Sequence, residues 1–135
     1  MSPDNERMMR EKLRQDGGMG VYATLNIPKI KDAINTSDVL VESLYSWDEL
    51  KILQENFSNI TTIAIVVDKN IRYERLENRV YRPLTKEEAA KRDLTETENI
   101  KKCEPIANAD YYIMNNGTIE EFYERCDEVL NEIYK

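Results

Sequence analysis

Short apolar runs alternate along the chain with longer segments that carry apolar residues at helical spacing. The strongest strand signal is residues 61–67, which end in Ile63-Ala64-Ile65-Val66-Val67, are rich in β-branched residues and lack polar alternation. Residues 38–42 and 111–114 are two further runs of this kind. Because a strand without polar alternation is typically buried on both faces, we expect 61–67 to be a central strand of a parallel sheet.

Capping residues and helical spacing predict helices around these strands. Ser46, Thr85 and Thr118 each precede a Glu by three positions, which is the capping-box pattern. The predicted helices cover 3–16 with Ser2 as N-cap, 47–56, 68–81, a segment that begins at 85, and a segment that begins at 118. Pro28 lacks an N–H and is expected to break 19–35 into two short helices.

Three strand candidates separated by helices, with no hairpin turn, predict an α/β fold built on a three-layer parallel sheet. A length of 135 residues fits a single domain over 1–135. The longest apolar run, Ile63 to Val67, is far short of the ~20 residues that cross a membrane, and the amino terminus is charged. We therefore expect a cytoplasmic protein with no membrane partner.

Composition excludes several kinds of chemistry. The chain has no His, which removes Ser-His-Asp and Cys-His catalysis and most zinc sites. Cys103 and Cys126 form no CxxC motif, so we expect two reduced thiols and no metal site. A net charge of −7, from 19 basic and 26 acidic residues, disfavours binding to nucleic acid.

The arginines are concentrated in one part of this acidic chain. Five of nine lie within residues 72–92, and four of them follow one another at spacings of three, four and three: Arg72, Arg75, Arg79 and Arg82. Those spacings place the four on one stripe of the predicted helix. Two interpretations stay open: a stripe that binds one anion, or an exposed stripe paired with neighbouring glutamates, namely Glu74, Glu77 and Glu87.

The segment over about 82–104 is too polar for the core, although its cap and Ala89-Ala90 favour a helix. Such a helix suits a lid that closes over a ligand, and an ordinary solvated helix explains the composition equally well. Arg92-Asp93 is its most suggestive pair.

Ligands of open parallel sheets bind beyond the carboxyl ends of the strands, which here are Glu42-Ser43, Val67-Asp68 and residues 114–117. Asn115-Asn116-Gly117 offers amide donors and acceptors that suit a base edge, although most such triplets are simply turns. Gly17-Gly18 follows a helix, so we interpret it as a helix terminus and not a phosphate loop.

Several motifs occur in an order that resembles the P-loop kinases of the dephospho-CoA kinase and nucleoside monophosphate kinase type. The residues are Arg10-Glu11-Lys12-Leu13 through Gly20, Val41-Glu42-Ser43, Arg72-x-x-Arg75-Leu76-x-x-Arg79, Arg92-Asp93, and Ala109-Asp110-Tyr111-Tyr112-Ile113-Met114-Asn115-Asn116-Gly117-Thr118. The last block is the most specific part, and the match extends over most of the chain. The resemblance implies a P-loop kinase-like fold with a helical lid.

The resemblance also implies roles for individual residues. Arg75 and Arg79 resemble arginines near the transferred phosphates, and Arg92 belongs to the lid. Asn116 and Gly117 correspond to the adenine site, and Glu42 to the acceptor site. ATP and Mg²⁺ are the cofactors that the resemblance implies, and a nucleotide or a CoA-like molecule is the expected ligand.

The sequence departs from this family at one decisive point. No G-x-x-x-x-G-K-[ST] motif occurs in it, so the phosphate cradle, the phosphate-binding Lys and the hydroxyl ligand of magnesium are missing. We therefore expect an incomplete sheet, in a fragment or degenerate member of an ATP-dependent small-molecule kinase without activity of its own. The alternative is a non-catalytic nucleotide-binding or protein-interaction module. An uncovered strand 61–67 would either pair directly with 38–42 or favour a homo-oligomer.

Overall fold

The structure is a computed structural model that describes residues 3–135, and its contacts divide the chain into two compact units. The first unit contains residues up to Ile60 together with Ile100–Pro105, and the second contains Thr61–Asn99 together with Ile106–Lys135. The fold is mixed α/β, mostly helical, with one small parallel sheet. The single domain over 1–135 stays a prediction.

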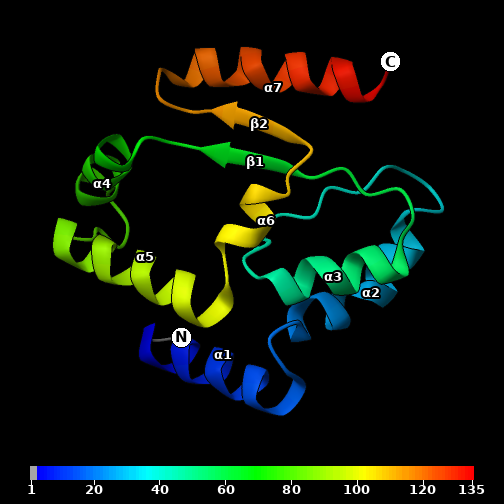
Figure 1. Cartoon of the computed structure of the whole chain (residues 1–135), viewed down its shortest axis with the longest axis horizontal. Helices are drawn as coiled ribbons and strands as arrows, with labels where there is room; N and C mark the ends of the chain where they lie inside the picture. Colours follow the sequence, from blue (N-terminus) through cyan, green and yellow to red (C-terminus); the bar gives the residue numbers. More distant parts are fainter. Residues whose placement is uncertain (1–2) are drawn as a thin grey trace. The chain divides into compact units, whose positions relative to one another are not determined.

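The elements follow one another as labelled in Figure 1. They are α1 (Pro3–Gly17), α2 (Val21–Ala33), α3 (Trp47–Asn56), β1 (Ile63–Val66), α4 (Lys69–Asn78), α5 (Lys86–Ile100), α6 (Cys103–Ala107), β2 (Tyr111–Met114) and α7 (Ile119–Ile133). None of the helices within 3–135 is long and apolar enough to cross a membrane.

The predicted capping boxes are confirmed. The Ser46 hydroxyl accepts from the Glu49 amide, and the Glu49 carboxylate accepts from the Ser46 amide. Thr85 with Glu88, and Thr118 with Glu121, make the same reciprocal pair of hydrogen bonds. The predicted cap at Ser2 lies outside the described residues. Gly18, with φ of 80°, ends α1 by donating to the Arg14 carbonyl, which confirms the predicted helix terminus.

The predicted break at Pro28 is wrong, because α2 continues through that residue. Proline removes one backbone hydrogen bond and costs a helix interior about 3 kcal/mol. Tertiary packing outweighs this cost, since Ala23 before the proline and Ile30 after it are both buried and belong to the same core cluster.

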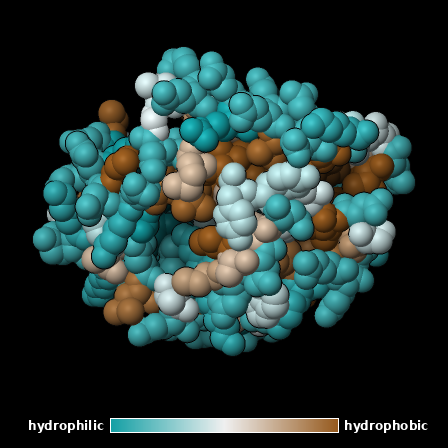
Figure 2. Space-filling view, turned by 45° about the horizontal axis from the view of Figure 1, so that its top comes forward, coloured by the Kyte–Doolittle hydropathy of each residue, from teal (hydrophilic) through white to brown (hydrophobic). Residues whose placement is uncertain are grey.

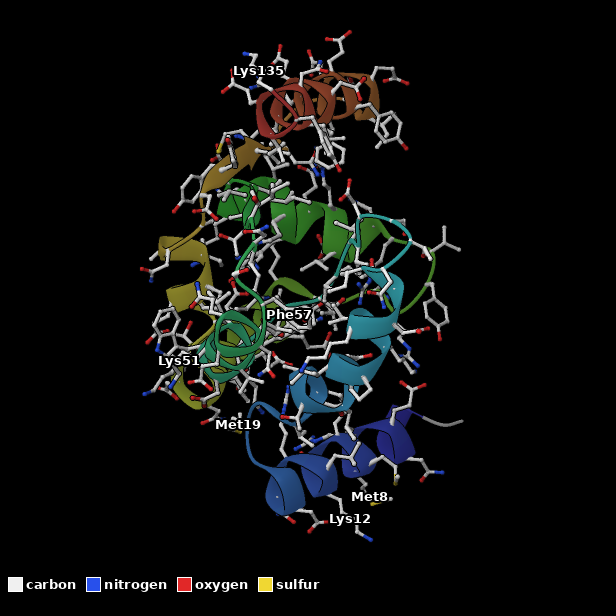
Figure 3. All side chains as sticks on the ribbon, turned by 90° about the vertical axis from the view of Figure 1, so that its right-hand side faces the viewer. Met8, Lys12, Met19, Lys51, Phe57 and Lys135 are labelled. Carbon is white, nitrogen blue, oxygen red and sulfur yellow. The ribbon has the colours of Figure 1, made fainter. Side chains whose placement is uncertain are left out.

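The core of the first unit lies between α2 and α3. Ala23, Ile30 and Leu53 form its buried cluster, and five partly buried side chains pack against it: Val39, Leu44, Ile52, Phe57 and Ile60. Phe57, labelled in Figure 3, caps the carboxyl end of α3 and so closes one end of this cluster. The apolar spacing of α3 therefore serves packing against α2.

The strand predicted at 38–42 is absent. These residues form an irregular loop, in which Leu40 is 90% exposed and Val41 is also exposed. Direct pairing of 38–42 with 61–67, one of the two alternatives considered for an uncovered strand, is absent too, because β1 pairs only with β2 among residues 3–135. An apolar run becomes a strand only where a neighbouring strand accepts its hydrogen bonds, and this run has no such neighbour.

β1 and β2 pair in parallel, with Ile63 opposite Tyr111 and Val66 opposite Met114. The connection between them contains α4, α5 and α6, and α7 then packs against β2, as the sequence predicts (Figure 1). The predicted strands at 61–67 and 111–114 are thus confirmed, and they are parallel. β1 is shorter than the range predicted for it.

The predicted burial of both sheet faces is wrong. Ala64 and Ile113 are buried, whereas Ile65 is 59% and Tyr112 50% exposed. Two strands with one helix against β2 leave much of the sheet uncovered, and apolar surface (brown in Figure 2) is visible between the polar side chains. An exposed apolar strand of this kind is typical of a sheet that lacks neighbours.

Asp110 joins the amino ends of the two strands. Its carboxylate accepts from the Thr62 amide at 2.8 Å and from the Thr62 hydroxyl at 2.7 Å, and the Asp110 amide donates to the Thr62 hydroxyl at 3.0 Å. These hydrogen bonds, first that of the Thr62 amide, lower the pKa of Asp110 below its ordinary value. The acidic residue of the most specific sequence block therefore has a structural role.

Acid should reduce the contribution of Asp110 to the stability of the protein. A lowered folded-state pKa means that the stabilisation by Asp110 is fully present above the unfolded-state pKa and is lost as the pH falls through the folded-state pKa. We expect the stability difference between the wild type and Asp110→Asn to be constant above about pH 5 and to shrink below it. Urea midpoints from pH 7 to pH 3 measure it, and Thr62→Val should reduce the same pH dependence. A difference that grows in acid would contradict this assignment.

Candidate functional site

The carboxyl ends of β1 and β2 carry the turn that the sequence singled out. The Asn115 amide donates to the Val66 carbonyl at 2.8 Å, which continues the parallel pairing by one residue. The Asp68 amide donates to the Asn116 side-chain oxygen at 2.9 Å. The turn at 115–117 is therefore fixed to the end of β1, and the amide nitrogen of Asn116 points away from that hydrogen bond.

Arg75 holds the same turn from α4. Its Nη1 donates to the Asn115 carbonyl at 2.6 Å and its Nη2 donates to the Gly117 carbonyl at 2.8 Å. One guanidinium thus bridges the two carbonyls on either side of Asn116. Three of the residues that the sequence indicated as site candidates, Arg75, Asn116 and Gly117, lie together in the structure.

A hollow of about 190 Å³ lies beside this turn. It is lined by residues 114–118 and, from the first two turns of α7, by Glu121, Phe122 and Arg125. We call it the turn hollow. An aromatic ring, an arginine and a carboxamide around one hollow offer stacking, charge and hydrogen bonds to a planar polar ligand.

Gly117 has little space beside it for a side chain. A Cβ atom built on it would lie 1.7 Å from Glu121 Oε2, the oxygen that accepts from the Thr118 amide in the capping box. A larger residue would require the flexible end of the Glu121 side chain to move, which would rearrange its hydrogen bond with the Thr118 amide.

The predicted stripe of four arginines is wrong beyond Arg75. The helix ends at Asn78, Arg79 has extended backbone angles, and Arg82 lies outside the helix with φ of 51°. Pro83 cannot continue a helix and disfavours helical geometry at the residue before it. Arg79 Nε donates to the Arg82 carbonyl, so this arginine fastens the bend after α4.

Arg72 makes a different contact, with Asp93 of α5. Its Nη1 and Nη2 donate to the two Asp93 carboxylate oxygens, both at 2.6 Å, and the Tyr73 hydroxyl donates to Asp93 Oδ2 at 2.8 Å. The hydrogen bond to Asp93 raises the pKa of Arg72, and burial followed by that same carboxylate raises the pKa of Tyr73. One of the two interpretations paired the stripe with nearby glutamates. Arg72 instead pairs with Asp93, which lies in the predicted lid.

The predicted lid segment contains α5, with Ala89 buried and Leu94 exposed. Arg92 Nε donates to Glu96 Oε1 at 2.7 Å, one turn along the same helix. Arg92 therefore lies on α5 beside Asp93 and is held by a contact within the helix.

Glu42 belongs to the first unit. It lines a small cavity of about 50 Å³ with residues of α2, α3 and the loop before α3, next to Ser43, whose φ of 65° is unusual for a serine. The structure therefore places this predicted acceptor residue in a loop that carries backbone strain.

Within 3–135 no three Cys, Asp or Glu side chains lie close enough to hold a metal ion, so we assign no magnesium ligand. Cys103 and Cys126 form no disulfide with each other. The sequence alone did not indicate three residues that contribute to these contacts, namely Tyr73, Phe122 and Arg125. Arg125 carries the clearest missed signal, since a side chain four positions after Glu121 lies on the same face of a helix that starts at the turn.

No family model matches the chain. It is similar to a UPF0200 protein of Sulfurisphaera tokodaii, with 36% identity over 135 residues that cover 96% of this chain and 73% of the relative. A UPF0200 protein of Pyrococcus horikoshii is 31% identical over 98% of this chain and 73% of the relative. One of Hyperthermus butylicus is 31% identical over 98% of this chain and 70% of the relative.

Proposed function

The chain belongs to the UPF0200 family, and from the site described above we propose that it is a fragment or degenerate member of an ATP-dependent kinase for a small nucleotide-like or CoA-like acceptor. The observation that carries the proposal is the turn hollow at the carboxyl ends of β1 and β2, which is where open parallel sheets bind their ligands. Asn116 and Gly117 provide the base side of this site.

The uncovered sheet supports a P-loop kinase-like fold for the complete site. In kinases of this type, the strand before the phosphate loop lies between the strands that resemble 38–42 and 61–67. Residues 38–42 form no strand, and among the described residues β1 pairs with β2 alone, as expected where such a strand is lacking.

The chemistry of this function needs positioning and neutralisation of charge, which suits a chain without histidine. Arg79 and Arg92 are the proposed phosphate-side residues. Glu42, which belongs to the first unit, keeps only the acceptor role that the resemblance implies. Transfer also requires the phosphate cradle and its lysine, whose motif this sequence lacks, so the chain is expected to bind nucleotide without transferring phosphate.

Nucleotide binding should raise the melting temperature. At a hundredfold excess over Kd, a ligand of the native state adds about 2.7 kcal/mol, which shifts the melting temperature by several degrees. A thermal-shift panel of ATP, ADP, nucleoside monophosphates and dephospho-CoA measures this effect. No shift with any of them would contradict nucleotide binding.

Asn116→Asp sharpens the test, because it keeps an oxygen acceptor for the Asp68 amide while it replaces the amide donors by a second carboxylate oxygen and adds one negative charge. We expect it to abolish the shift. Asn56→Asp on α3 is the matched control, since it makes the same chemical change at an exposed residue that does not line the turn hollow, and it should keep the shift.

A further inference from the structure

The geometry of Arg75 points to a role that differs from phosphate binding. We propose that Arg75 is a positioning residue, which fixes the turn at 115–117 and thereby sets the shape of the turn hollow for the base of a nucleoside. This inference rests on the proposed function and changes the role that the resemblance implies for Arg75.

The first step is the bidentate contact. Two N–H groups of one guanidinium reach the carbonyls of Asn115 and Gly117 at 2.6 and 2.8 Å, and both of these residues line the turn hollow. The planar fork of an arginine matches two acceptors at fixed separation, which a flexible lysine does not. Arg75 therefore fixes the separation of the two peptide groups around Asn116.

The second step is the direction of the Asn116 side chain. Its oxygen accepts from the Asp68 amide at 2.9 Å, and its amide nitrogen then carries the free donors. With the backbone held by Arg75 on both sides and the side chain held by the end of β1, these donors have one orientation. A preorganised donor binds a ligand without the cost of ordering it.

The third step distinguishes Arg75 from its neighbours on α4. Arg72 is engaged by Asp93 and Arg79 by the Arg82 carbonyl, so among these three arginines only Arg75 contacts the turn. Of the two arginines that the resemblance places near the transferred phosphates, Arg79 remains on the phosphate side and Arg75 moves to the base side.

The ligand-free protein gives a test that does not depend on nucleotide binding. In Arg75→Ala, hydrogen exchange of the Asn115 and Asp68 amides, both bonded within the anchored turn, should accelerate at least about tenfold. The Tyr111 amide, bonded to Thr62 at the other end of the sheet, should be unchanged. Arg79→Ala is the matched control and should leave all three amides unchanged. Unaltered exchange of Asn115 and Asp68 in Arg75→Ala would overturn the inference.

The ligand test compares adenosine with ATP, using folded protein well below its melting temperature. We expect Arg75→Ala to weaken both by the same factor, about tenfold, because only the base site is disturbed. Arg75→Lys, which reaches one carbonyl at a time, should restore part of the affinity. A loss for ATP that greatly exceeds the loss for adenosine would make Arg75 a phosphate ligand and overturn the inference. If wild type binds neither compound, the proposed function fails and the exchange result alone decides the role of Arg75.

Discussion

Replacement of Leu53 by alanine is expected to lower the free energy of unfolding by about 2–5 kcal/mol. Leu53 lies on α3, is 7% exposed and packs in the cluster with Ala23 and Ile30 of α2. Removal of its side chain takes away apolar contacts and leaves a cavity. The cavity stays largely unfilled, because two helices that pack along their lengths cannot move closer at one residue alone.

Trp47 makes this effect directly measurable. It is the single tryptophan of the chain and the first residue of α3, so its fluorescence during urea unfolding reports on the first unit. Leu40→Ala is the matched control, since it is the same substitution in the same unit at a side chain that is 90% exposed. We expect it to change stability by no more than about 0.5 kcal/mol. Equal midpoints for the two variants would show that the cluster is not the core of this unit.

The helices were predictable from sequence because their signals are local. A Ser or Thr followed three positions later by Glu fixes a helix start through hydrogen bonds between near neighbours, and all three such boxes form. Pro28 misled the prediction, because its local penalty is opposed by packing of Ala23 and Ile30, which no local pattern reveals.

The sheet was predictable only in part, because a strand depends on a distant partner. Residues 61–67 and 38–42 carry the same apolar signal, yet the first has β2 beside it and the second has no strand partner among the described residues. The oligomeric state, which the exposed sheet would influence, stays a prediction.

The candidate site was predictable in its location and not in its contacts. The carboxyl ends of parallel strands located Asn116 and Gly117, as the sheet rule requires. Spacing alone placed four arginines on one stripe, whereas Pro83 ends that helix early and three of them take separate partners: Asp93, the turn and Arg82. The partner of a long side chain depends on tertiary geometry that its spacing does not encode.

Asp93→Ala is expected to destabilise the protein by about 1–3 kcal/mol and to loosen α5 from α4. The carboxylate receives two charge-assisted hydrogen bonds from Arg72 and a third from Tyr73. The side chains of Arg72 and Asp93 are 38% and 30% exposed, so solvent screening keeps the effect below that of a fully buried pair. The variant also leaves the Tyr73 hydroxyl without this acceptor.

Hydrogen exchange and a double-mutant cycle measure the two effects. Exchange along α5 should accelerate in Asp93→Ala while exchange in 61–67 changes little. Arg72→Ala should cost less in the Asp93→Ala background than in the wild type, because the two substitutions share one contact and only the contact of Arg72 with the Tyr73 ring remains to be lost. Lys51→Ala is the control for an exposed pair, since it breaks the contact with Asp48 at 2.9 Å and should cost at most about 0.5 kcal/mol. Additive losses for Arg72 and Asp93, with α5 exchange unchanged, would show that another contact holds the predicted lid against α4.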